Sequence, residues 1–174
     1  MAGNAFIRFK KSGKEAPGES TQVNFENWVE IGDWSWDIEA ESSFTKGSGA
    51  AVGKAVPGAF SFTHFFDTSS PVIMGNIVKG VHFDSVEVVM LKQVGDGELK
   101  QYFKIQMKHA FTTKVSTKGG EDGSVSQDFE LVAKEIMIEY KPQENSGEIK
   151  KSAIPFYWNI ATNSIEGSLP DKLA

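Results

Sequence analysis

Apolar and polar residues alternate along most of this chain with the period of two that is typical of half-buried β-strands. Phe60, Phe62 and His64 alternate with Ser61 and Thr63. Residues 101–111 repeat the pattern, with aromatic and aliphatic side chains separated by lysine and glutamine. Shorter runs of the same kind occur at 4–9 and 156–160. The pattern predicts a chain that is mainly β, with strands that have one buried and one solvated face.

Residues 23–39 form another long alternating run. The apolar residues of its second half are at even-numbered positions: Trp34, Trp36 and Ile38. The polar residues between and after them are at odd-numbered positions: Ser35, Asp37 and Glu39. The first set is expected to face the core and the second set to face water. The paired tryptophans are also typical of a platform that stacks on a sugar or a base, so core packing and ligand stacking are both considered.

The period changes once, at Ser70–Lys79. Pro71 suits the first helical position, because its missing N–H would be unpaired there, and Ser70 is expected to cap the free amides. Ile73 with Ile77 and Met74 with Val78 lie four residues apart, which predicts one apolar stripe. Gly80 follows and permits the left-handed conformation that ends a helix. We expect a short helix that flanks the sheet.

Two further features predict how the strands connect. Gly95-Asp96-Gly97 separates two long apolar arms and is typical of a hairpin turn. In residues 125–141, Phe129 and Leu131 are odd-numbered whereas Ile136 and Ile138 are even-numbered. A strand cannot change faces without an extra residue, so we expect a bulge or bend near 133–135.

The stretch Ser42–Pro57 is rich in glycine, serine and alanine and is too long for an ordinary connection, so we expect an extended loop there. Its run GSGAAVGKA invites a phosphate-loop interpretation. That motif requires glycine where Ser48 stands and a hydroxyl residue where Ala55 stands, and no helix pattern follows. A loop that is either flexible or ordered by a partner is the better interpretation.

Composition narrows the function classes. The chain has 174 residues, no cysteine and a formal net charge of −5. One domain is expected, without disulfides or thiol catalysis. The negative charge disfavours nucleic acid as a partner. No apolar run predicts a signal peptide or membrane insertion, so we expect a protein made in the cytoplasm that leaves the cell, if it does, by another route.

Histidines are the remaining candidates for chemistry. His64, His82 and His109 lie on separate predicted strands, and His82 would share a strand face with Asp84. That pair could orient a base or hold a metal, although a hydrogen-bonded surface histidine explains it as well. No G-x-S-x-G or H-E-x-x-H motif occurs. We predict no catalytic residue, no metal site and no cofactor.

A set of ordered motifs carries a resemblance across nearly the whole chain. They are FIRF from Phe6, GES from Gly18, VEIGDWSW ending at Trp36, FSFTHFFDTSSPVIM, QYFKIQMKHAFTTKVSTKGG, FELVAKEIMIEYKPQ and YWNIATN. In this order they resemble the haemolysin-coregulated protein (Hcp) family, the tube subunit of the type VI secretion system. The sequence departs from the family pattern at His64, where lysine is common, and in a longer loop at 11–16.

The resemblance implies a single-domain, two-sheet β-barrel over residues 1–161, with a flanking helix and a C-terminal tail at 162–174. It implies a structural function rather than an enzymatic one: hexameric rings of this chain stack into a hollow tube. A contractile sheath expels the tube with a tip spike protein, and effectors travel in its lumen. The subunit is thereby secreted without a signal peptide, to the medium or into target cells.

The resemblance also implies site residues. Ser35 occupies the family's cargo-contacting position, so Ser35, Asp37 and Glu39 are expected to line the lumen. The extended loop is expected to contact other rings and neighbouring subunits through Phe44, Lys46, Gly47, Gly49, Val52 and Lys54. Two alternatives stay open: a phage or contractile-injection tail tube protein, and a small β-barrel enzyme that uses His82 and Asp84.

Overall fold

In the computed structural model of this chain, residues 4–41, 53–95 and 97–170 are described, and they form twelve strands and one helix. The elements are β1 (Ala5–Lys11), β2 (Lys14–Ala16), β3 (Val29–Ile31), β4 (Trp34–Ser35), β5 (Ile38–Glu39), β6 (Val56–Pro57), β7 (Phe60–Phe65), α1 (Ser70–Lys79), β8 (Phe83–Gln93), β9 (Leu99–Gly119), β10 (Val125–Val132), β11 (Glu135–Tyr140) and β12 (Ile154–Asn159). The predicted class, mainly β with one short helix, is confirmed.

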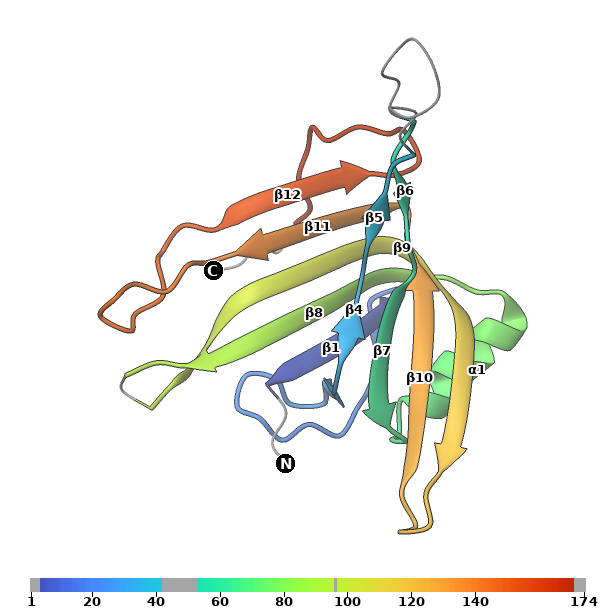
Figure 1. Cartoon of the computed structure of the whole chain (residues 1–174). Coiled ribbons are helices and arrows are strands. Elements are labelled where there is room, and N and C mark those ends of the chain that lie inside the picture. The colour runs from blue at the N-terminus through green and yellow to red at the C-terminus, as the bar shows by residue number, and fades with distance from the viewer. Residues whose placement is uncertain (1–3, 42–52, 96, 171–174) are drawn as a thin grey trace.

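The strands make two sheets that share β9 (Figure 1). The first sheet contains β2, β1, β3, β8, the N-terminal half of β9, β11 and β12. The second contains β4, β7, β10 and the C-terminal half of β9. Strand β9 changes direction at His109, whose φ of 49° departs from the extended conformation. One long bent strand therefore joins two differently oriented sheets.

The expected barrel is not closed among the described strands. Strands β2, β4 and β12 each pair with one neighbour, so they end the ladders as edges. On this side residues 29–35 connect the two sheets, because β3 pairs with β1, and Gly32 and Asp33 then exchange backbone hydrogen bonds with Thr63 of β7 before β4 begins. The architecture is an open arrangement of two packed sheets.

An aromatic core fills the space between the sheets. Phe9 of the first sheet lies 5.0 Å from Phe83 and 6.1 Å from Phe62 of the second, measured between ring centroids. Phe62 in turn stacks on Phe129 at 5.4 Å. These rings are at most 2% exposed, because alternation directs the same parity of each strand inward.

The face change predicted near 133–135 is confirmed. Strand β10 pairs with β9 in the second sheet through Val132, and β11 pairs with β9 in the first sheet from Glu135. Between them, Lys134 donates its backbone N–H to the carbonyl of Lys108. The two intervening residues thus carry the chain from one sheet to the other. The predicted turn at 95–97 likewise joins β8 to β9, with Asp96 outside the described residues.

Helix α1 is confirmed at Ser70–Lys79, with Pro71 in its first turn and Gly80 at φ 66°. Two details of the prediction are wrong. The N-cap position is Ser69, because the turn before it is already closed: Asp67 accepts a hydrogen bond from the Ser69 N–H, and Ser70 Oγ accepts one from the Asp67 N–H. Val78 is 87% exposed, since it lies outside the stripe of Ile73, Met74 and Ile77 that packs on the core.

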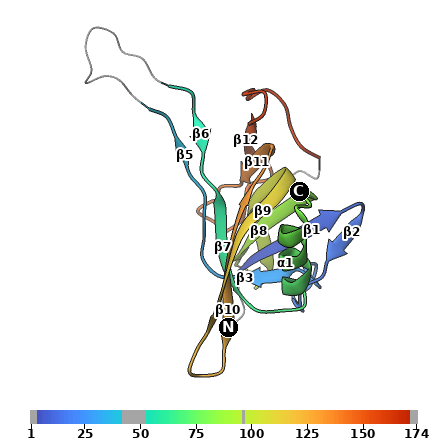
Figure 2. The same cartoon turned by 90° about the vertical axis from the view of Figure 1, so that its right-hand side faces the viewer.

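The run at 23–39 also differs from the prediction of one strand. It divides into β3, β4 and β5, and β5 pairs with β6 to form a separate two-stranded ribbon. Figure 2 shows that this ribbon projects away from both sheets. Ile38 is therefore 44% exposed rather than buried with the tryptophans. The end of the predicted loop at Ser42–Pro57 is strand β6, and residues 42–52 lie outside the described residues.

The outer face of the first sheet is covered by two segments. The loop at 17–28 places Phe25 and Trp28 on Phe6 and on neighbouring strand β8. Near the other edge, Leu169 is 3% exposed, and its backbone N–H lies 3.4 Å from the sulfur of Met137. Leu169 thus packs on the side of β11 that faces away from the core.

Charged side chains lie buried beneath the loop at 17–28. The Glu87 side chain is 5% exposed, and it accepts a 2.7 Å hydrogen bond from Arg8 Nε and lies 3.5 Å from Lys104 Nζ. The guanidinium carbon of Arg8 is 4.5 Å from the centre of the Trp28 ring. The attraction between the Glu87 carboxylate and the two cations offsets the cost of removing these charges from water. Removing any one of the three would leave a buried charge without its compensation.

His64 is the notable buried polar group under the helix. It lies between Phe62 and Phe129, its Nε2 is 3.2 Å from Gln127 Oε1, and Nδ1 has no hydrogen-bond partner among the described residues. Burial lowers the pKa of His64 below its usual 6.5, and the Asp67 carboxylate and the Gln127 hydrogen bond offset this only in part. The neutral form is therefore favoured in the fold.

We predict that His64 makes the fold acid-sensitive. Below pH 6.5 the unfolded chain takes up a proton that the folded chain resists, so the free energy of unfolding falls as pH drops toward the lowered pKa, by about 1.4 kcal/mol per pH unit at most. Urea unfolding at pH 7.5 and 5.5 measures this. His64→Phe should reduce the difference between the two pH values, whereas His82→Gln, on the surface, should not. Equal pH dependence in wild type and His64→Phe would contradict the assignment.

Replacement by alanine is predicted to change stability in opposite directions at Gly18 and Gly75. A Cβ at Gly18 would lie 2.4 Å from the Trp28 carbonyl oxygen and 2.7 Å from the Val29 Cα, both immobile backbone atoms. Gly18→Ala should therefore cost about 2–3 kcal/mol of stability. Gly75 lies inside α1, and a methyl group added there would meet nothing within 4 Å, so Gly75→Ala should add about 0.5–1 kcal/mol. Thermal and urea unfolding of both variants check this pair, and a neutral Gly18→Ala would refute the close approach of Gly18 to Trp28.

Candidate functional site

The exposed face of the second sheet carries a polar surface that the alternation creates. While Phe60 and Phe62 point into the core, Ser61 and Thr63 point outward from β7. The register continues this row across the sheet, because Ser35 pairs with Ser61, Ser61 with Glu130 and Glu130 with Lys114. Hydroxyls and charges of both signs therefore share one sheet face.

Ser35 lies at the edge of this face. Its hydroxyl is 2.7 Å from that of Ser61 on the neighbouring strand. A shallow hollow of about 220 Å³ opens beside the pair, and Asp33, Thr63 and Asp128 contribute to its lining. Asp128 also receives a 2.6 Å hydrogen bond from Lys118 Nζ. These groups can donate and accept hydrogen bonds to a polar surface, and no histidine in the hollow activates a hydroxyl.

Trp34 and Trp36 pack on the core side of the segment that carries Ser35. The Trp34 ring stacks between Phe60 and Phe103, at centroid distances of 5.7 and 5.6 Å, and its Nε1 lies 3.3 Å from the Met90 sulfur. Trp36 lies 6.5 Å from Trp158. Both tryptophans pack against the core, as the core interpretation predicts. Because Trp34 is flanked on both faces, its neighbour Ser35 has a fixed position.

The polar residues predicted at 35, 37 and 39 are all exposed, and they follow one another along the edge from β4 into β5. The Asp37 carbonyl accepts the Gly58 N–H at 2.9 Å. A Cβ on Gly58 would lie 1.7 Å from the Asp37 carboxylate, so the absence of a side chain at Gly58 lets these two segments of the backbone approach each other. Glu39 pairs with Val56 in the projecting ribbon. Whether these residues face a lumen stays a prediction.

Of the residues predicted for the interaction loop, only Lys54 falls in the described part of the chain, where it is exposed. It follows Gly53, whose N–H donates to the Glu41 carbonyl at 2.6 Å and extends the ribbon by one bond. The other predicted loop residues, which lie outside the described residues, are Phe44, Lys46, Gly47, Gly49 and Val52.

The structure brings His82 and Asp84 together, with 3.5 Å between His82 Nε2 and Asp84 Oδ1. Both side chains are more than 40% exposed. The His82 ring contacts His109 and Phe111, and Asp84 accepts the backbone N–H of Ser12. Asp84 thus orders a turn, and the pair lies on an open surface. Over the residues that the structure describes, no group of three or more histidines and carboxylates could hold a metal ion.

Sequence reasoning did not select Ser61, Thr63, Asp128 or Glu130 as members of this surface. Their strands were expected, and the parity of Ser61 and Thr63 already predicted a solvated face. What alternation cannot supply is which strands lie next to each other, and here β7 pairs with both β4 and β10. The missing signal was therefore strand order.

The chain matches the family described as "Type VI secretion system effector, Hcp" over residues 6–142. This protein belongs to the Hcp family. Protein hcp1 of Pseudomonas aeruginosa is 27% identical over 165 residues, which cover 94% of this chain and 98% of that protein. A match of this length necessarily extends past residue 142, where the family region ends.

Solved Hcp structures share the fold. One described as a type six secretion system protein gives a TM-score of 0.83 at 24% identity, covering 94% of this chain and 99% of its own. Hcp1 from Salmonella typhimurium gives 0.69 at 25%, covering 92% and 97%. Hcp1 from Escherichia coli EAEC 042 gives 0.72 at 19%, covering 86% and 97%. The predicted type VI secretion family is confirmed.

Family membership places this chain in a secretion system. In the part of the chain that the structure describes, the one helix is too short to cross a membrane.

Proposed function

We propose that this Hcp protein is a tube subunit, and that copies of it form hexameric rings that stack into a hollow tube. The observation that carries the proposal is an apolar surface on the first sheet that the second sheet does not cover. We call it the overhang, and its exposed residues are Tyr140, Ile154 and Phe156, with Ile138, which packs partly on the core, at its inner border. A surface of this kind marks an interface with another protein chain.

The overhang is a continuation of the core. Ile136 and Trp158 pair across β11 and β12 and are at most 3% exposed. The next pair on the same face is Ile138 with Phe156, and the last is Tyr140 with Ile154. Exposure rises along this row, to 38% at Phe156 and 63% at Ile154. This side of β11 and β12 therefore carries apolar residues typical of a core, but it extends past the end of the second sheet, which covers the rest of it.

Open edges supply a second support for assembly. Strands β4 and β12 each end a ladder, and exposed edges favour pairing with further chains. An interface formed by different surfaces of two identical copies closes into a ring when the rotation between them is favourable. The ribbon of β5 and β6 projects away from both sheets (Figure 2), and in this proposal it contacts a neighbouring copy or the next ring.

In this proposal the polar face with Ser35, Asp37 and Glu39 lines the bore. Exposed hydroxyls and carboxylates stay hydrated there, and they offer weak, exchangeable hydrogen bonds to an effector that must later be released. The mechanism is mechanical: a contractile sheath expels the tube behind its tip spike protein, and the subunit leaves the cell with it. The chain itself forms and breaks no bond, so it is not an enzyme and needs no cofactor.

The overhang predicts a variant that prevents assembly. Ile154→Glu with Phe156→Glu would bury two carboxylates in the proposed interface, so the assembled species should be replaced by single chains. Light scattering after size-exclusion chromatography measures the mass. Val78→Glu on α1, where the valine is 87% exposed, is the matched control and should assemble as the wild type does. Rings that survive the double substitution, or a wild type that is a single chain at every concentration, would refute the proposal.

Bore placement can be measured by spin-label distances, because the chain has no native cysteine. Ser35→Cys labels the polar face, and Glu26→Cys labels the loop on the opposite side of the molecule. A hexameric ring should give three distances in a ratio of about 1:1.7:2. The distances from position 35 should be the shorter set if that face lines the bore. Shorter distances from position 26 would place the polar face outside and leave ring formation itself intact.

A further inference from the structure

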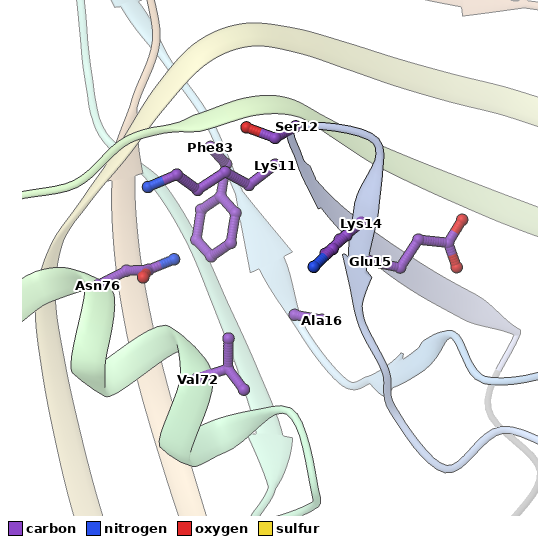
Figure 3. A pocket seen from close by; sticks show the side chains of 8 residues that line it. All are labelled: Lys11, Ser12, Lys14, Glu15, Ala16, Val72, Asn76 and Phe83. Atoms are coloured by element: carbon purple, nitrogen blue, oxygen red, sulfur yellow. The ribbon is translucent and has the colours of Figure 1, made fainter.

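A groove separate from the polar face and the overhang lies between the β1–β2 hairpin and α1 (Figure 3). Its volume is about 410 Å³, within the range of small binding sites. Phe83 and Ala16 form an apolar floor and are 2% and 6% exposed. Val72 and Asn76, one helical turn apart, form the wall on α1. The groove thus joins an apolar base to a polar rim.

Two lysines make this rim cationic. Figure 3 shows Lys11 and Lys14 reaching over the gap, whereas Glu15 turns away from it. Glu15 is held elsewhere, 3.3 Å from Arg8 and 4.0 Å from Lys10. No carboxylate within the described ranges pairs with Lys11 or Lys14. The Asp84 carboxylate lies at the same turn, where it accepts the backbone N–H of Ser12, but it forms no ion pair with either lysine. Both ammonium groups are therefore available to an anionic ligand.

The two lysines also oppose each other in the hairpin. Lys11 and Lys14 are direct cross-strand partners, an arrangement in which like charges repel. The turn between them uses positive φ at Ser12 and Gly13, at 50° and 75°, which fixes the two strands in this register. An anionic group bound between the ammonium groups would relieve the repulsion. Charge complementarity therefore selects an acidic ligand.

The free backbone edge of β2, beside the groove, favours an extended peptide as the ligand. Strand β2 pairs only with β1, so its other edge has no partner strand in the described part of the fold. A peptide can add to such an edge as a further strand, with alternate side chains directed into a neighbouring groove. A carboxylate in register with the lysines would then place an apolar side chain near Phe83 and Val72.

We propose that the groove between the β1–β2 hairpin and α1 binds an extended segment of a partner protein in which acidic and apolar residues alternate. The acidic residues contact Lys11 and Lys14, the apolar residues contact the floor of Phe83 and Ala16, and the backbone adds to the edge of β2. This site is independent of the ring interface proposed above, because it uses neither the overhang nor the polar face.

The test uses the full chain and fluorescein-labelled peptides, with binding followed by fluorescence anisotropy. The probe is the peptide Asp-Val-Glu-Val-Asp-Val. One control replaces its acidic residues by lysine, and the other replaces its valines by glycine. We expect saturable binding of the probe, with a Kd below about 1 mM, and at least tenfold weaker binding of both controls.

Variants connect the binding to the groove. Lys11→Glu with Lys14→Glu should weaken probe binding at least tenfold. Lys150→Glu with Lys151→Glu, which changes the net charge equally at an exposed loop, should leave it unchanged. The proposal is overturned if the wild type does not bind the probe, or if both double variants lose binding alike. It is also overturned if Lys11→Glu with Lys14→Glu changes the assembled mass, since the groove would then join copies of this chain.

Peptide binding and ring assembly are read out separately, by anisotropy and by mass. A chain that binds the probe but stays single would therefore refute the ring proposal alone. A chain that forms rings without binding the probe would refute the groove proposal alone.

Discussion

The bend in β9 is the constraint on which the rest of this structure depends. One strand of 21 residues supplies an edge for β8 and β11 before His109 and for β10 after it. Because the strand cannot serve both sheets in one direction, it must bend, and the two sheets then pack face to face around Phe9, Phe62 and Phe129. The switch between β10 and β11 at residues 133–134 is the corresponding turn in the partner strand.

This geometry also distributes the outer surfaces. Each sheet buries one parity of its residues, so the second sheet necessarily presents hydroxyls and charges on its free side. The first sheet has more strands than the second, so part of its core-facing side is not covered by the second sheet. A polar side and an apolar margin on one small domain are what a repeating assembly requires, since one surface stays hydrated while the other is buried between copies.

Much of the fold was predictable from local patterns. Alternation identified the two-faced strands, Pro71 and Gly80 set the limits of the helix, and the parity change placed the crossing between sheets. Features that depend on strand order were not predictable, because alternation assigns a face to a residue but not a neighbour. The sheet ends at β4 and β12, and the exposure of Ile38 where β5 leaves the sheet, are of this kind. The family's motifs indicated Ser35, whereas its companions Ser61 and Asp128 required the register.

The buried Leu169 has a consequence for chimaeric or naturally extended versions of this protein. By packing near Met137, it attaches residues up to 170 to the side of the first sheet that faces away from the core, while Ser35 is displayed by the other sheet. A passenger domain joined after this point would therefore depart from the back of the subunit. To travel beside Ser35 instead, it would need a linker long enough to pass around the domain, or release of Leu169 from its contact with the sheet.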